Sequence, residues 1–242
     1  MIKINTVDEA KEALLSRIGF DHVDSISGIN DELFIENTKQ LVRLEDKFGA
    51  IHKSSLTRFD DVNHANAAAC AESGYATPHI QNLSLCRSHY FDKAQMLQKE
   101  KKWIDSKWSV PCLESELPIV SLTHEYGHMI QNNLVAQAMR EAGWNENNYF
   151  AFIDRKAKSA NAKFKWYIKQ RKSVQDMCYN EIIAIAKEKN PLFVLEDNIS
   201  GYGNTSKAEF FAEVFANSQL GKPNELGNAM NEWLKRKGLI IE

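Results

Sequence analysis

Hydrophobic residues near the start of the chain recur at the spacing of a helix. Between residues 31 and 49 they lie among charged residues, at Leu33, Ile35, Leu41, Leu44 and Phe48. Apolar residues three or four positions apart share one face of a helix. We therefore expect an amphipathic helix over residues 31–49, with its apolar face packed against the rest of the molecule.

The pattern changes after this helix, and three short segments have the character of strands. Ser55–Phe59 alternates loosely between apolar and polar residues, Ala67–Cys70 is small and apolar, and Gln81–Arg87 alternates through Leu83 and Leu85. A period of two places successive side chains on opposite faces of a strand. These segments predict a small mixed sheet of about three strands.

From about Asp92 onward the pattern predicts helices almost throughout. We expect them, in chain order, over Ala94–Lys107, from near Ser115 with Pro118 in the first turn, as one or two lysine-rich helices between Asn145 and Lys189, over Lys207–Gln219, and over about Asn224–Lys237. Proline is tolerated in a first turn because its missing N–H would have no partner within the helix. Strands followed by a run of helices predict an α+β fold with a mostly helical C-terminal half.

The length of the chain and its lack of a linker-like segment predict one compact unit. A chain of 242 residues suits one substantial domain. No segment rich in proline, glycine or serine marks a linker. We expect residues 1–50 to form a helical N-terminal extension and residues 51–242 to form the main domain.

Composition and charge exclude several classes of protein. A hydrophobic fraction of 43% with 26% charged residues is ordinary for a globular protein. The formal net charge of −2 gives no electrostatic basis for binding nucleic acid or an anionic membrane. No apolar run approaches the ~18 residues that cross a membrane, and the N-terminus lacks the apolar core of a secretory signal. We expect a cytoplasmic protein, with association with a virion or export by a non-standard route as alternatives.

The cysteines are widely spaced, and no two of them form a Cys-x-x-Cys pair. They are Cys70, Cys86, Cys112 and Cys178. This spacing gives no sign of a disulfide framework, so we expect four reduced thiols.

A His-Glu-x-x-His motif lies at the centre of the chain, at His124, Glu125 and His128. On a helix, residues four apart lie on one face, so the two imidazoles can share one tetrahedral cation. Glu125 lies about 100° further round the helix, from where it can reach a water bound to the metal. The surrounding segment is largely apolar, which favours burial, and buried imidazoles require a partner. A pair of surface histidines is the alternative interpretation.

Gly127 lies within this motif, between the two histidines. Glycine inside a helix costs roughly 1 kcal/mol relative to alanine. Its presence predicts that another element packs tightly against this turn.

A catalytic zinc needs a third protein ligand and an open position. Glu209 and Glu213 lie four apart on a predicted helix that is otherwise largely apolar. Two like charges on one face are destabilising unless a cation or donor compensates them. A zinc ion would compensate these charges, with Glu209 as its ligand and Glu213 accepting a hydrogen bond from the N–H of a ligating histidine. Ser206 and Glu209 also fit a capping box, in which Glu209 only closes the start of the helix, so spacing alone leaves both interpretations open.

Two blocks of sequence resemble a known family of metallopeptidases. They are His124-Glu125-Tyr126-Gly127-His128 and Gly201-Tyr202-Gly203-Asn204-Thr205-Ser206-Lys207-Ala208-Glu209-Phe210-Phe211-Ala212-Glu213. Both are similar to the gluzincin-type zincins, a family that includes the catalytic domain of anthrax toxin lethal factor and zincin-like domains of phage head-morphogenesis proteins. The first 50 residues lie outside this resemblance.

The resemblance implies a zincin-like fold, in which the small sheet packs on the zinc-binding helix. It implies one Zn²⁺ ion held by His124, His128 and Glu209. It also implies that Glu125 is the catalytic base and that the hydroxyl of Tyr202 stabilises the oxyanion.

The function implied by the resemblance is that of a zinc-dependent endopeptidase. Its polypeptide substrate is expected as an extended strand at a sheet edge near Gln81–Arg87. A catalytically silent scaffold, serving as a phage structural or protein-binding component, is the alternative, although the presence of Glu125, Glu209 and Tyr202 together argues against it. The segment Arg155–Lys172 has eight basic residues and no acidic one. We interpret it as a solvated helix face with its aromatic residues packed inward, and expect no nucleic-acid partner.

Overall fold

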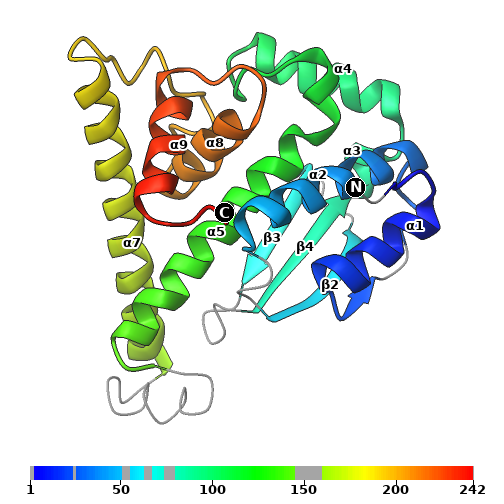
Figure 1. Ribbon diagram of the computed structural model, residues 1–242, viewed down its shortest axis with the longest axis horizontal. Coiled ribbons are helices and arrows are strands. Elements are labelled where there is room, and N and C mark those ends of the chain that lie inside the picture. The colour runs from blue at the N-terminus through cyan, green and yellow to red at the C-terminus, as the bar shows by residue number, and fades with distance from the viewer. Residues whose placement is uncertain are drawn as a thin grey trace.

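The molecule is a mixed α+β structure in which helices predominate. The computed structural model describes residues 3–23, 26–50, 55–62, 67–73, 80–144 and 160–241. Its central helix, α5 (Val120–Glu141), runs diagonally through the molecule in Figure 1. The sheet and the N-terminal helices lie on one side of α5, and the C-terminal helices lie on the other. The helix that carries the His-Glu-x-x-His motif, α5, is therefore covered from both sides.

The sheet is four-stranded and mixed. Its strands are β1 (His22–Val23), β2 (Ser55–Val62), β3 (Ala69–Ser73) and β4 (Ile80–Cys86), in the order β1-β2-β4-β3. β1 and β4 pair with β2 in parallel, and β3 pairs with β4 in antiparallel orientation. The three strands expected from the sequence are present, although the one expected at Ala67–Cys70 is β3 at Ala69–Ser73. The two-residue β1 is an addition.

The position of β4 corrects one expectation from the sequence. The segment Gln81–Arg87 was expected to lie at a sheet edge, and this is wrong, because β4 is paired with β2 on one side and with β3 on the other. The strand at the edge beside α5 is β3. Alternation of side chains reveals a strand but carries no information about its neighbours.

The N-terminal segment begins with helices that the hydrophobic pattern did not reveal. They are α1 (Val7–Glu12) and a π-helical continuation, η1 (Ala13–Ile18). The expected helix follows as α2 (Asp31–Phe48), which Asn30 caps through its side chain. It ends at Gly49, whose φ of 56° is a left-handed conformation that glycine adopts without strain.

The middle of the chain leads into α5 through three short elements. These are α3 (Arg87–Tyr90), α4 (Lys93–Asp105) and the 3₁₀ segment η2 (Glu114–Ile119). The helix expected from near Ser115 therefore begins as a 3₁₀ turn that contains Pro118, and becomes α-helical at Val120. A 3₁₀ turn at a helix start is common.

Three helices complete the fold. They are α7 (Ala160–Lys189), α8 (Lys207–Gln219) and α9 (Glu225–Arg236). α8 has the bounds that its apolar spacing predicted. Residues 145–159, where an expected lysine-rich helix begins, lie outside the described residues.

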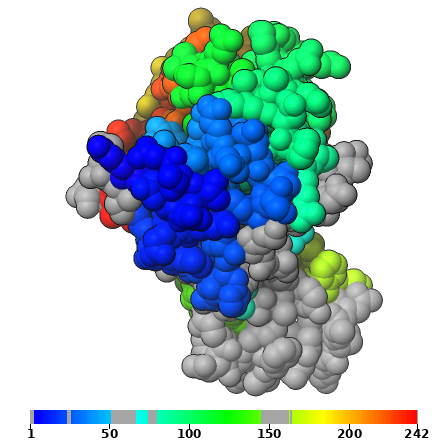
Figure 2. Space-filling model, turned by 90° about the vertical axis from the view of Figure 1, so that its right-hand side faces the viewer, coloured from blue at the N-terminus to red at the C-terminus, as the bar shows by residue number. Residues whose placement is uncertain are grey.

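One hydrophobic core joins the two sides of the molecule. It includes residues from the first helices, the sheet, α5 and the C-terminal helices, among them Leu14, Leu33, Leu83, Met129, Phe211 and Trp233. The first 50 residues thus share the core of the main domain. Figure 2 shows them covering one face of the molecule beside the α3–α4 segment.

Polar contacts hold α2 against the motif helix. The hydroxyl of Tyr126 donates to Glu45 at 2.8 Å, and Nε2 of Gln40 donates to the hydroxyl of Thr123 at 2.9 Å. All four side chains in these bonds are buried. An unpaired polar group in such a place would lower the stability of the fold. These two bonds join α2 to α5.

Two further expectations concern the cysteines and the membrane. All four cysteines are free thiols, as expected; Cys86, Cys112 and Cys178 are buried and Cys70 is partly exposed. Among the described residues, no helix combines the length and apolarity needed to cross a bilayer.

Candidate metal centre and active site

Close packing of α5 on α8 places the two sequence motifs against each other. A Cβ built on Gly127 would lie 2.9 Å from Cα of Ala212 and 3.1 Å from Cβ of Phe215. Any side chain at this position would force the two helices apart. The tight contact predicted from Gly127 is therefore confirmed, and its partner is the helix that carries Glu209.

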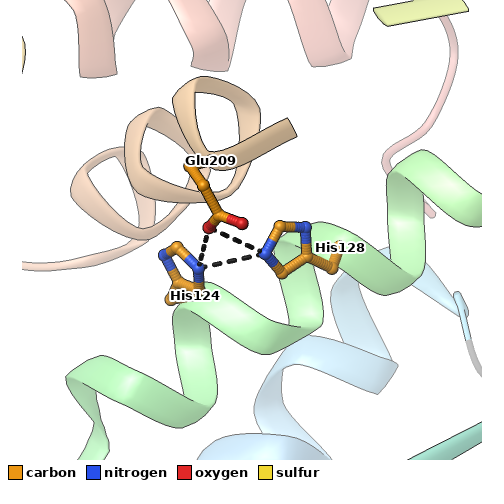
Figure 3. A group of neighbouring side chains, drawn as sticks. All are labelled: His124, His128 and Glu209. Carbon is orange, nitrogen blue, oxygen red and sulfur yellow. Dashed lines mark hydrogen bonds and ion pairs between the residues drawn. The ribbon is translucent and has the colours of Figure 1, made fainter. Parts of the chain in front are cut away.

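Three side-chain atoms converge between these helices. Oε2 of Glu209 lies 3.0 Å from Nε2 of His124 and 3.2 Å from Nε2 of His128, and the two nitrogens are 3.1 Å apart (Figure 3). Tetrahedral zinc with bonds of about 2.0–2.1 Å separates its ligand atoms by roughly 3.3–3.4 Å. The spacing of the three atoms fits such an ion, and the group could hold a metal.

The two interpretations of Glu209 prove compatible. The hydroxyl of Ser206 accepts a hydrogen bond from the backbone N–H of Glu209 at 3.2 Å, so Ser206 caps α8. The carboxylate of Glu209 lies at the two histidines. The backbone of Glu209 thus serves the cap while its side chain completes the cluster.

A buried carboxylate orients His124. Oε1 of Glu213 lies 2.9 Å from Nδ1 of His124, and its other oxygen accepts from the hydroxyl of Ser200 at 2.5 Å. Ser200 in turn accepts from the N–H of Gly203 at 3.0 Å. A carboxylate at Nδ1 favours a proton there, which leaves the lone pair of Nε2 directed at the cluster. This is the contact that the sequence analysis assigned to Glu213.

The electrostatics of the cluster favour positive charge. Burial lowers the pKa of His124, but its hydrogen bonds with Glu209 and Glu213 outweigh this and raise the pKa to about 10. Burial raises the pKa of Glu209, but the bonds from His124 and His128 hold it far below its usual range. The carboxylates therefore stabilise a cation at this point, whether a proton or a metal ion.

Glu125 lies beside the cluster and faces the sheet. Its Oε2 accepts a hydrogen bond from the backbone N–H of Ala71, in β3, at 2.7 Å. Glu125, His128 and Glu209 line a cavity of about 700 Å³ that also follows β3. The carboxylate is thus next to the candidate metal ligands and open to a molecule in this cavity.

Tyr202 covers the other side of His124. The two rings are stacked, with centroids 5.4 Å apart and planes at 29°. Burial raises the pKa of the Tyr202 hydroxyl, and the nearby charges of Glu209 and Glu125 raise it further, so the hydroxyl remains a proton donor. Tyr202 lines the same cavity. The structure therefore brings together all six site residues expected from the sequence: His124, Glu125, His128, Tyr202, Glu209 and Glu213.

Two groups that bind site residues could not be predicted from the sequence. The backbone amide of Ala71 carries no side-chain chemistry, and Ser200 lies in a turn with no motif of its own. Periodicity cannot identify groups that act through their position against a distant element.

Other candidate groups lie apart from this cluster or have different roles. His89 pairs with Glu100, its Nε2 lying 2.8 Å from Oε1, and both side chains are buried. In the basic segment Tyr167 is buried as expected, but Phe164 is 46% exposed, so the inward packing expected for all its aromatic residues is wrong there. Residues 155–159 of that segment lie outside the described residues.

Comparison with known proteins adds no relative. No family model, no curated protein and no solved structure matches this chain.

Proposed function

We propose that this chain is a zinc-dependent endopeptidase with a zincin-like fold. The observation that carries the proposal is the convergence of His124, His128 and Glu209, with Glu125 beside them. Of these residues Glu125, His128 and Glu209 line a cavity bounded by an edge strand. This arrangement unites a ligand set, a base and a surface that can pair with a peptide backbone.

The donor set suits zinc in a catalytic role. Two imidazoles and one carboxylate are ligands found in catalytic zinc sites, which use three protein ligands and leave a position for substrate or water. Zinc bound here would supply a Lewis acid that polarises the scissile carbonyl and lowers the pKa of water. Glu213 holds a proton on Nδ1 of His124, and so keeps Nε2 available as a ligand.

Two side chains of this protein would carry out the remaining steps of the reaction. Glu125 accepts a proton from the attacking water and transfers it to the departing amine. The hydroxyl of Tyr202 donates a hydrogen bond to the oxygen of the scissile carbonyl as negative charge develops there. Both groups line the cavity in which the peptide bond would lie.

The edge of β3 offers the binding surface for an extended peptide. In an antiparallel pair, the backbone groups of alternate residues point towards the partner strand and away from it. Because the N–H of Ala71 reaches Glu125, the outward-facing residues are Ala69, Ala71 and Ser73. The N–H of Ala71 is already donated to Glu125, so a substrate strand added here would pair with the other outward backbone groups and lie beside Glu125.

Metal analysis combined with a peptide-library cleavage assay tests the proposal. Wild type should contain one zinc ion and cleave peptides. Glu125→Gln should retain zinc and lose cleavage, whereas Glu209→Ala should lose both. Glu196→Gln, an exposed change outside the cavity, is the control and should behave as wild type.

Each contrary outcome has a defined meaning. A wild-type protein without zinc would refute the metal centre. Zinc retained without cleavage across diverse peptides would refute the peptidase and favour the alternative of a silent protein-binding scaffold.

A further inference from the structure

The cavity of about 700 Å³ at the metal centre continues beyond the reacting residues to helix α7. Besides Glu125, His128 and Glu209, its lining includes Asn132 of α5 and Arg171 of α7. Among the described residues that line the cavity, Arg171 alone carries a fixed positive charge. It belongs to the basic segment noted in the sequence, and the proposed reaction gives it no role.

The contacts of β3 show how the cavity runs away from the reacting centre. Ala71 is bonded to Glu125, whereas Ser73, two residues later, lies opposite Gln81 of β4. Oε1 of Gln81 accepts a hydrogen bond from Nδ2 of Asn132 at 3.1 Å. The end of β3 is therefore level with Asn132, one helical stretch beyond Glu125.

Helix α7 borders this far end of the cavity. Nε2 of Gln175 donates to Oε1 of Gln131, on α5, at 3.4 Å. The two helices run in opposite directions, with the start of α7 near the end of α5 (Figure 1). Arg171 precedes Gln175 by one turn, so it lies further from Glu125 along α5 than Gln175 does. It therefore lies at the end of the cavity that Asn132 and Ser73 mark.

The guanidinium of Arg171 has no partner in the described part of the chain. The residue is partly buried, and its side chain makes no hydrogen bond or ion pair there. Further along the same helix, by contrast, Asp176 pairs with Lys207 at 2.6 Å. A partly buried cation has lost hydration that an anion would replace. The planar N–H groups of arginine fit a carboxylate through two parallel hydrogen bonds.

The acidic residues of the cavity leave this role to a ligand. Glu209 is bonded to the two histidines, and Glu125 to the N–H of Ala71. Glu72 also lines the cavity, but it is exposed and forms no ion pair with a described residue. Solvent and salt screen such an exposed charge, so its repulsion of an incoming carboxylate is weaker than direct hydrogen bonds from Arg171.

The distance from the reacting centre to this end of the cavity corresponds to a few residues of a peptide. Asn132 follows Glu125 by seven residues, which is roughly 10 Å along a helix. An extended chain advances about 3.3 Å per residue. A peptide lying along β3 would therefore bring its third residue or so from the scissile bond to Arg171.

We propose that Arg171 binds a carboxylate of the polypeptide substrate, about three residues from the scissile bond on the side of Ser73. The inference rests on the proposed peptidase function and names the substrate class of the same cavity. The carboxylate belongs to a glutamate or aspartate side chain or to the C-terminus of the substrate. Arg171 thereby determines which peptides bind and takes no part in the cleavage step.

Cleavage of matched peptides tests the assignment. Peptides with blocked termini carry Glu, Gln or Lys at each position two to four residues from the cleaved bond. Wild type should cleave the best Glu peptide with a kcat/KM about tenfold or more above that of its Gln counterpart, as expected for hydrogen bonds to a charged group. Gln peptides that end in a free carboxylate at the same distances show whether a side chain or the C-terminus supplies the anion.

Substitutions of Arg171 test whether this residue makes the distinction. Arg171→Gln should bring the ratio of kcat/KM for the Glu peptide to that for the Gln peptide close to one. Arg171→Glu should reverse the selection and favour the Lys peptide. Lys172→Gln removes the neighbouring charge, which is exposed and outside the cavity, and should keep the wild-type ratio. Each variant should retain zinc.

A binding measurement separates failure of this inference from failure of the peptidase proposal. The same peptides are titrated into Glu125→Gln protein and into the double variant Glu125→Gln/Arg171→Gln, and calorimetry gives the Kd. Tighter binding of the Glu peptide that the double variant loses would support the inference, even if wild type cleaves no peptide and the peptidase proposal fails.

Three results would overturn the inference. Cleavage by wild type with no preference for a carboxylate would do so and leave the peptidase proposal standing. A preference that persists in Arg171→Gln would exclude Arg171 as its source. Absence of both cleavage and binding would remove the basis for a substrate site in this cavity.

Discussion

The backbone N–H of Ala71 donates a hydrogen bond of 2.7 Å to Oε2 of Glu125. The bond joins the edge strand of the sheet to the carboxylate proposed as the base. It holds that carboxylate on the path of a peptide paired with β3. In the proposed mechanism the edge strand would thus position the base as well as bind the substrate.

Ala71→Pro removes this donor without breaking the sheet. The N–H of Ala71 points away from β4, and proline is tolerated where an edge-strand N–H faces outward. The carboxylate of Glu125 would lose its fixed position, and a misplaced catalytic group can cost up to about 10²-fold in rate. We expect kcat to fall by about 10–100-fold with zinc content unchanged.

Ser73→Pro is the matched control for this change. The N–H of Ser73 also points outward from β3, but among the described residues the bond to Glu125 comes from Ala71, two residues away. Ser73→Pro should therefore raise KM and leave kcat near the wild-type value. Equal values of kcat in Ala71→Pro and wild type would show that the bond to Ala71 does not position the base.

Glu213→Gln should weaken zinc binding while preserving the fold. The amide has nearly the volume of the carboxylate but lacks the charge that stabilises the proton on Nδ1 of His124. Changing such a partner typically costs about 10–100-fold in metal affinity. Competition with a chelator of known affinity measures the Kd for zinc, with Glu196→Gln as an exposed control. An unchanged Kd would mean that Glu213 has only a structural role.

Tyr202→Phe isolates the proposed oxyanion donor. The ring that stacks on His124 remains, so zinc affinity and stability should be close to wild type. Losing one oxyanion donor typically costs about 10²–10³-fold in kcat. Steady-state kinetics with a cleaved library peptide measure the loss, and Tyr179→Phe removes a hydroxyl outside the cavity as a control. A variant with wild-type kcat would exclude the hydroxyl from the reaction.

Gly127→Ala should destabilise the protein although alanine favours helices. The propensity gain is about 1 kcal/mol, but the new Cβ would lie 2.9 Å from Cα of Ala212, and backbone cannot yield as a flexible side chain does. Overpacking of this kind typically costs about 1–3 kcal/mol. Denaturant unfolding should show a lower free energy of unfolding, whereas the exposed change Gln137→Ala in the same helix should stay within about 0.5 kcal/mol of wild type. A stabilised Gly127→Ala protein would contradict the close helix crossing.

The sequence by itself determined the local features of this protein. The four-residue spacing of His124 and His128 puts both imidazoles on one helical face, because the period of the helix is fixed by its backbone hydrogen bonds. The apolar spacing of Lys207–Gln219 located α8 in the same way. The low tolerance of helices for glycine indicated a close partner at Gly127.

Only the tertiary structure decided which distant segments meet. It brought Glu209 to the histidines, although the same residue also belongs to a helix cap. It placed β4 inside the sheet and β3 at its edge, so that Ala71 rather than the segment 81–87 borders Glu125. Such contacts depend on how elements pack and pair over long separations, and neither periodicity nor propensity describes that packing.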